Sequence, residues 1–193
     1  ARKREVSMAG SGVISDANIY PAILNAIAGT KFKIINGYAG TNESNLALER
    51  GEVEGRGGGA YSSLVSTRPL WLKNRQITVL AQVGTEKEAD LPDVPLLTDL
   101  ATNEEDLQIA KLVTLPVSIG YNFWLSPDVS PDLVKILSRA FSSAMKDPEL
   151  IESAKKQSLD IRPKTAEELT RMLQDASRIP EPVLKKTATI LGW

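Results

Sequence analysis

The first 60 residues of the chain alternate between strand-like and helix-like segments, with glycine turns at the junctions. Their apolar pattern predicts short strands at residues 5–9, 31–35 and 52–55. Helical segments fill the two intervals between these strands, which leaves little room for hairpins. Such alternation favours a parallel sheet with crossover helices, so the sequence predicts an α/β fold.

Both intervening helices carry recognisable start or stop signals. Apolar residues recur at helical spacing in the first helix: Ile19, Ile23, Leu24 and Ile27. Ser15 or Asp16 is expected to cap the start of this helix, and Gly29 is expected to end it. Thr41 or Asn42 is expected to cap the second helix, because a short side-chain oxygen can accept from the first backbone N–H groups.

The remainder of the chain is predicted to be mixed at first and then helical. Apolar runs predict strands at residues 77–83 and 119–125, and the second of these would place Trp124 in the core. An edge strand is expected at residues 159–162. Helix starts are indicated by Ser130-Pro131, by Asp147-Pro148 and by the capping-box pair Thr165 and Glu168. A last helix is expected over residues 181–191.

The composition excludes several kinds of function. The 193 residues have a formal net charge of −1, whereas nucleic-acid-binding proteins normally show a basic patch. The absence of cysteine and histidine excludes disulfides, thiolate or histidine catalysis, and zinc sites built on these residues. The sequence contains no run of about 18 apolar residues, so no membrane span is expected. These features favour a binding protein, for which we expect no catalytic residue, no metal and no cofactor.

Three glycine-rich loops are expected at one edge of the sheet, at residues 10–16, 37–43 and 55–63. Ligands of open parallel sheets bind beyond the carboxyl ends of the strands. The first two loops lead into helices, whose first N–H groups favour anions. Glycine also lets the backbone approach a ligand closely, although it is equally an ordinary turn residue. This pattern suits a small carboxylate or another small oxyanion.

The charged residues and glycines near these loops each have a second interpretation. Arg56 could pair with a ligand carboxylate, or make a solvated or structural contact. Glu52 and Glu54 would share one face of a strand, but surface charge is favoured over paired-carboxylate catalysis. The glycines match no dinucleotide fingerprint, because Ser15 stands where the third glycine is required. Residues 57–59 also lack the lysine and hydroxyl residue of a P-loop.

One segment resembles a known family. GYAGTNESNLALERGEVEG (residues 37–55) is similar to the receptor component of the tripartite tricarboxylate transporters, the Bug-type extracytoplasmic solute receptors. Glu54 departs from the aspartate usual in the family. Supporting matches occur at residues 29–33, 91–95 and 147–150, so the resemblance covers nearly the whole chain.

The resemblance implies a type II periplasmic-binding-protein fold with two α/β lobes. Residues 1–116 would form a complete ligand-binding lobe with a parallel-rich sheet and flanking helices. Residues 117–193 would form the C-terminal part of the second lobe, and the N-terminal half-lobe and export signal would be absent. The apolar faces so exposed would be covered by another copy, in a homodimer or an exchanged-segment oligomer.

The resemblance also implies periplasmic capture of a small organic carboxylate and its delivery to the permease subunits of a membrane transporter. In this family the acid is held largely by main-chain amides and bridging waters. The implied contacts are Ser11, Gly12, Ala39, Gly40, Thr41, Asn42, Ala60 and Tyr61. The alternative is the effector-binding domain of a bacterial transcriptional regulator, which shares the two-lobed fold. An enzyme on an α/β scaffold is disfavoured.

Overall fold

A three-stranded parallel sheet forms the centre of the computed structural model, which describes residues 1–157, 159 and 161–193. The strands are β1 (Val6–Gly10), β2 (Phe32–Asn36) and β3 (Gly55–Arg56), and their order in the sheet is β2-β1-β3. All of the pairings are parallel. The predicted α/β fold with a parallel sheet is therefore confirmed.

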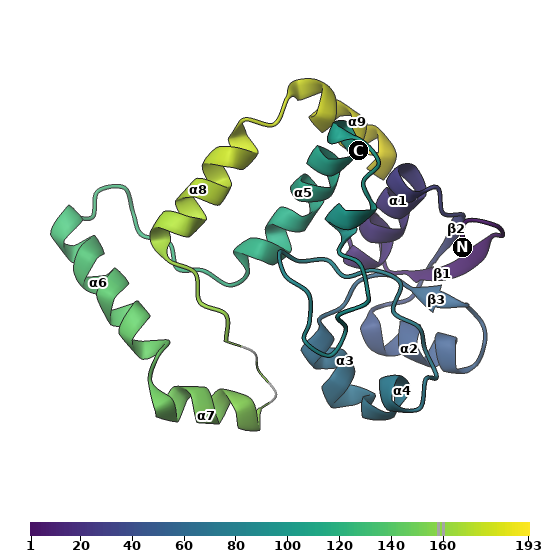
Figure 1. Cartoon of the computed structure of the whole chain (residues 1–193), viewed down its shortest axis with the longest axis horizontal. Coiled ribbons are helices and arrows are strands. Elements are labelled where there is room, and N and C mark those ends of the chain that lie inside the picture. Colours follow the sequence, from purple (N-terminus) through teal and green to yellow (C-terminus); the bar gives the residue numbers. More distant parts are fainter. Residues whose placement is uncertain (158, 160) are drawn as a thin grey trace.

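Helices α1 (Asp16–Ala28) and α2 (Thr41–Glu49) lie on opposite sides of the strands (Figure 1). The strand order explains this arrangement. The connection through α1 runs from the central strand to one edge, whereas the connection through α2 runs back past the centre to the other edge. Right-handed crossovers in opposite directions place their helices on opposite faces. Ligand sites of such sheets lie where the strand order reverses.

The predicted ends of these two helices are partly confirmed. Ser15 occupies the N-cap position of α1, but its side chain makes no capping hydrogen bond, whereas Gly29 ends this helix as predicted, with a left-handed φ of 64°. The predicted cap of α2 was wrong, because Gly40 is the N-cap and Thr41 is already the first helical residue. The chain therefore enters α2 without a side-chain cap.

The segment after β3 contains α3 (Tyr61–Thr67), α4 (Pro69–Lys73) and the short 3-10 helix η1 (Leu97–Leu100). The strand predicted at residues 77–83 was wrong. Among the described residues of this segment, the only strand-like pairing is an isolated bridge between Gln82 and Leu96. Trp71 of α4 is buried.

The buried Gln82 side chain organises the loop that precedes η1. Its amide nitrogen donates to the carbonyl oxygens of Leu91 and Val94, at 2.9 and 3.0 Å, and its oxygen accepts from the backbone N–H of Glu88 at 2.8 Å. These bonds satisfy backbone groups that a neighbouring strand would otherwise satisfy. The apolar run is thus packed as a loop.

The strand predicted at residues 119–125 was also wrong. Helix α5 (Glu104–Ile119) continues through the start of this range until Gly120 ends it. Residues 121–125 then have no pairing strand within the described part of the chain. Trp124 is 72% exposed, which contradicts its predicted place in the core.

The helical character predicted for the last third of the chain is confirmed. It contains α6 (Pro131–Ala144), α7 (Pro148–Lys156), α8 (Ala166–Ser177) and α9 (Glu181–Leu191). Side chains of Ser130, Asp147 and Thr165 cap the first three of these helices, as predicted. The edge strand predicted at residues 159–162 includes a position outside the described residues.

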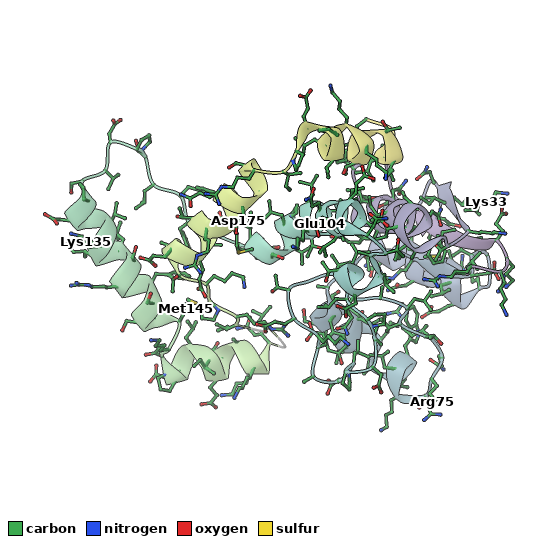
Figure 2. All side chains as sticks on the ribbon, turned by 45° about the horizontal axis from the view of Figure 1, so that its top comes forward. Lys33, Arg75, Glu104, Lys135, Met145 and Asp175 are labelled. Atoms are coloured by element: carbon green, nitrogen blue, oxygen red, sulfur yellow. The ribbon has the colours of Figure 1, made fainter. Side chains whose placement is uncertain are left out.

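Two apolar clusters stabilise the body of the molecule. The larger cluster joins α1, η1, α5 and α9, with Ile23, Leu97 and Ile109 almost completely buried. The smaller one joins β1 and α2 through Ala9, Ala47 and Val53. In contrast, α6, α7 and α8 extend away from the sheet in an arc (Figure 1), and Lys135 on α6 lies at the opposite end of the molecule from Lys33 (Figure 2).

Candidate functional site

A cavity of about 210 Å³ lies at the carboxyl edge of the sheet, where the loops after all three strands meet. It receives the β1–α1 loop, the start of α2 and the glycine run after β3. Its lining is almost entirely polar side chains and bare backbone: Ser11, Ser15, Asp16, Ala17, Gly40, Thr41, Ser44, Arg56, Gly57, Gly58 and Gly59. This is the position that the strand order predicts for a ligand.

The predicted contact residues are only partly brought together. Ser11, Gly40 and Thr41 line the cavity. Gly12, Ala39 and Asn42 are their chain neighbours but do not line it, and neither do Ala60 and Tyr61. The Tyr61 hydroxyl instead donates to the Asp90 carboxylate at 2.9 Å. Burial, and to a smaller extent this carboxylate, raises the pKa of Tyr61 to about 12.

Asn18 on α1 locks the β1–α1 loop, a role that no sequence pattern indicates. Its buried side-chain oxygen accepts from the backbone N–H groups of Ser11 and Gly12, at 3.1 and 3.3 Å. Its amide nitrogen donates to the Asn36 side-chain oxygen at 2.7 Å, at the end of β2. The Ser11 and Gly12 amides are therefore already used, and only the Ser11 side chain remains to face a ligand.

Gly10 makes room for this asparagine pair. A Cβ atom on Gly10 would lie 2.6 Å from the Asn18 oxygen and 2.7 Å from the Asn36 oxygen. No side chain fits at such distances without displacing both asparagines. The glycine at the end of β1 therefore leaves the space that the hydrogen bond between Asn18 and Asn36 requires.

The starts of α1 and α2 leave backbone N–H groups open at the cavity. The Ser15 hydroxyl donates to the Gly12 carbonyl at 2.7 Å and does not cap α1, while α2 begins at a glycine. Within the described chain, no acceptor is seen for the first-turn N–H groups of Thr41 and Asn42. By contrast, α5 and α8, away from the cavity, have side-chain caps. Open first turns favour an anion.

The N–H of Ala39, the residue before Gly40, is also already used. It donates to the Glu43 carboxylate at 2.6 Å. Of the amides predicted to hold a ligand in this second loop, those of Gly40, Thr41 and Asn42 have no acceptor among the described residues.

The glycine run after β3 lies directly against α1. Cβ atoms added to it would be 2.6 Å from the Pro21 ring at Gly57 and 2.4 Å from the Asp16 Cβ at Gly58. At Gly59 an added Cβ would be 2.8 Å from the Arg56 guanidinium. Close packing within the site therefore explains these three consecutive glycines.

Arg56 is a half-buried cation at this cavity. One guanidinium nitrogen donates to the Gly58 carbonyl at 2.8 Å, and no carboxylate among the described residues lies within ion-pair distance. Burial lowers the pKa of Arg56, as expected for a charge removed from water without a counter-ion.

A second cavity, of about 240 Å³, lies between the β1–α1 loop and the end of α9. No charged side chain lines it, and the residues that do include Val13, Ala22, Ile34 and Ile190. It offers less to an anion than the cavity at the carboxyl edge. No described helix is long and apolar enough to cross a membrane.

Comparison with known proteins connects this fold to one family. The crystal structure of a TctC solute binding protein from Polaromonas, solved without ligand, superposes with a TM-score of 0.65 at 15% sequence identity. The alignment covers 96% of this chain and 59% of that chain, so the protein spans well under two thirds of its neighbour. This likeness confirms the predicted periplasmic-binding-protein fold.

The sequence itself gives a more specific match. No curated protein matches the chain. The family model described as tripartite tricarboxylate transporter family receptor, however, matches residues 1–189. Because this match extends over nearly the whole chain, the protein belongs to the tripartite tricarboxylate transporter receptor family.

Proposed function

We propose that this protein is a periplasmic solute receptor that captures a small organic carboxylate and delivers it to the permease subunits of a tripartite tricarboxylate-type transporter. Membership of the receptor family supports this function over that of a transcriptional effector domain or an enzyme. The fold of the Polaromonas solute binding protein agrees with it. The ligand would occupy the cavity at the carboxyl edge of the sheet.

The uncapped starts of two helices support the assignment of a carboxylate ligand. The first turns of α1 and α2 meet at the same cavity, and neither helix has a side-chain cap there. Their open N–H groups and partial positive charges provide donors without any dedicated side chain. The Arg56 guanidinium adds a full positive charge. Such a site recognises an oxyanion mainly through the backbone.

The proposed division into lobes extends this mechanism. Residues 1–116 would form the lobe that holds the open helix starts, and residues 117–193 would belong to a second lobe. Closure of the two lobes would remove water from the acid and strengthen its hydrogen bonds. Helix α9 supports a close connection between the two parts, because it packs against α1 and α5.

Replacing Thr41 with proline tests the backbone contact directly. Proline is well tolerated at the first helical position, where it removes the N–H group together with the threonine hydroxyl. Thr41→Val removes the hydroxyl but keeps the N–H group, so the difference between the two variants isolates the backbone contact. We expect Thr41→Pro to weaken binding of the best acid by about 1.5–3 kcal/mol, the usual value of a hydrogen bond to a charged group. Stability without ligand should change little.

Thermal unfolding across a panel of acetate, succinate, glutarate and citrate provides the measurement. A ligand at one hundred times its dissociation constant should stabilise the protein by about 2.7 kcal/mol. Glu104→Pro, at the first residue of α5, is the matched control and should leave binding unchanged. If neither these acids nor an amino acid such as L-glutamate stabilises the protein, the carboxylate-receptor function is wrong. Equal binding by Thr41→Pro and the parent would reject the backbone contact.

We also propose that the exposed aromatic segment after α5 forms an interface between two copies of the chain. Tyr121, Phe123 and Trp124 are all largely exposed, and Phe123 packs edge-to-face on Phe141 of α6 with ring centroids 5.7 Å apart. The adjoining apolar side chains of α6 are also exposed: Leu133, Val134, Ile136 and Leu137. Exposed apolar surface of this kind favours association, and a net charge of −1 opposes it little.

Light scattering at micromolar concentration should therefore give the mass of a dimer. The variant Phe123→Glu/Trp124→Glu should be monomeric, because it places charges in the apolar interface. Lys33→Glu, which changes an exposed charge at the opposite end of the molecule (Figure 2), is the control and should remain dimeric. A monomeric parent protein would contradict the proposed interface.

A further inference from the structure

The cavity at the carboxyl edge of the sheet is lined by a negatively charged side chain as well as a positively charged one. Asp16, the first residue of α1, lines it together with Arg56. Both side chains lie beside the glycine run that follows β3. A Cβ on Gly58 would touch the Asp16 Cβ, and a Cβ on Gly59 would touch the Arg56 guanidinium. Even so, the two charged groups do not form an ion pair with each other.

Neither charge is matched by another protein group. In the chain as described, the Asp16 carboxylate has no ion pair and no hydrogen bond, and Arg56 has only its bond to the Gly58 carbonyl. Asp16 is exposed and complements the dipole of α1, but at this cavity its carboxylate would repel a ligand that carries only carboxylates. The charges instead balance inside the cavity.

A second acceptor lies next to Asp16. Ala17 also lines the cavity, and its carbonyl would normally accept from the N–H of residue 21 within the helix. Residue 21 is proline, which has no N–H, so this carbonyl lacks its usual helical partner. The carbonyl oxygen faces the glycine run, because a Cβ on Gly57 would lie 3.0 Å from it.

From this arrangement we infer that the ligand is a zwitterion of the amino-acid type, with its carboxylate held by Arg56 and the start of α2 and its ammonium held by Asp16 and the Ala17 carbonyl. The inference rests on the proposed receptor function and specifies the ligand class of the same site. Arg56 can offer a fork of donors to a carboxylate, and an ammonium group carries three donors for the acceptors on α1. Asp16 and Arg56 are then the specificity-determining residues.

Calorimetric titration with L-glutamate and glutarate tests this inference, because these two acids differ only in the ammonium group. We expect L-glutamate to bind the intact chain about tenfold or more tightly than glutarate, as for a charge-assisted hydrogen bond. Asp16→Asn should abolish this preference while glutarate binding is kept or improved. Arg56→Gln should weaken binding of both acids by about tenfold or more.

Two control variants separate ligand recognition from general effects of charge. Asp132→Asn makes the same change in the first turn of α6, and Arg50→Gln removes an exposed cation at the far end of α2. Both should keep the preference for L-glutamate. A merely structural role of Asp16, through the dipole of α1, would change stability but would not change the ratio of the two affinities.

The outcomes distinguish this inference from the proposed function. If glutarate binds as tightly as L-glutamate, and Asp16→Asn leaves the ratio unchanged, the zwitterion is wrong and the carboxylate receptor stands. If neither acid binds but another simple acid of the panel does, the conclusion is the same. If no acid or amino acid binds, both proposals are wrong.

Discussion

Asn18→Leu is expected to lower the free energy of unfolding by about 3 kcal/mol, because three polar groups lose their partner at once and each such loss costs about 1–3 kcal/mol. These groups are the N–H of Ser11, the N–H of Gly12 and the side-chain oxygen of Asn36. Leucine fills a similar volume but satisfies none of them. Urea denaturation, with the unfolding slope compared between variant and parent, measures the loss.

Asn25→Leu is the matched control, because α1 has a similar asparagine near its other end. The Asn25 side chain bonds the N–H and the carbonyl of Phe32, each at 2.8 Å, and accepts from the Thr30 hydroxyl. We expect this variant to be destabilised to a similar extent but to bind acids normally, since its bonds lie at the amino end of β2. Asn18→Leu should lose both stability and acid binding. An unchanged free energy of unfolding for Asn18→Leu would contradict the lock on the β1–α1 loop.

Features encoded within a few residues were predictable from the sequence. Each of the caps at Ser130, Asp147 and Thr165 requires only a side-chain oxygen and a backbone N–H two or three residues later. The Gly29 stop depends only on the ease with which glycine adopts a left-handed φ. The parallel sheet followed from three alternations of strand and helix. Local chemistry and short-range periodicity were sufficient for these elements.

The failed strand predictions concern segments whose structure depends on distant partners. Residues 77–83 have the composition of a strand, but Gln82 satisfies the neighbouring backbone from within a loop. Residues 119–125 have no strand to pair with among the described residues. An apolar run becomes a strand only when a neighbour supplies its hydrogen bonds, and the run itself does not identify that neighbour. Helix α5 was overlooked, although the cap at Asn103 and three acids in the first turn indicate its start.

The position of the cavity was predictable, but the contacts around it were not. The loops after the strands indicated the edge of the sheet at which this cavity lies, because this follows from topology alone. The side chain of Asn18 could not be placed, since its role depends on contact with Asn36, 18 residues away. Arg56 had two equal interpretations in the sequence, and its structural contact with the Gly58 carbonyl became visible only in the folded chain.

Gly58→Ala is expected to destabilise the protein by about 2–4 kcal/mol, because an added methyl group would cause both backbone strain and overpacking. Gly58 has a φ of 69°, and its Cβ would lie 2.4 Å from the Asp16 Cβ and 2.9 Å from the Asp16 carbonyl carbon. The glycine run would have to move away from α1, carrying the Arg56 guanidinium with it. Binding of the best acid should therefore fall together with stability, as measured by chemical denaturation and calorimetric titration.

Gly51→Ala separates the two causes. Gly51 has nearly the same φ, 72°, but nothing lies within 4 Å of its added Cβ. This variant should show only the strain, about 1 kcal/mol, and should bind acids like the parent. The difference between the two alanine variants then measures the close approach of residues 57–59 to α1. Equal losses of stability would mean that this loop does not lie against α1. Residues 57–59 would then not line the cavity that contains Asp16 and Arg56.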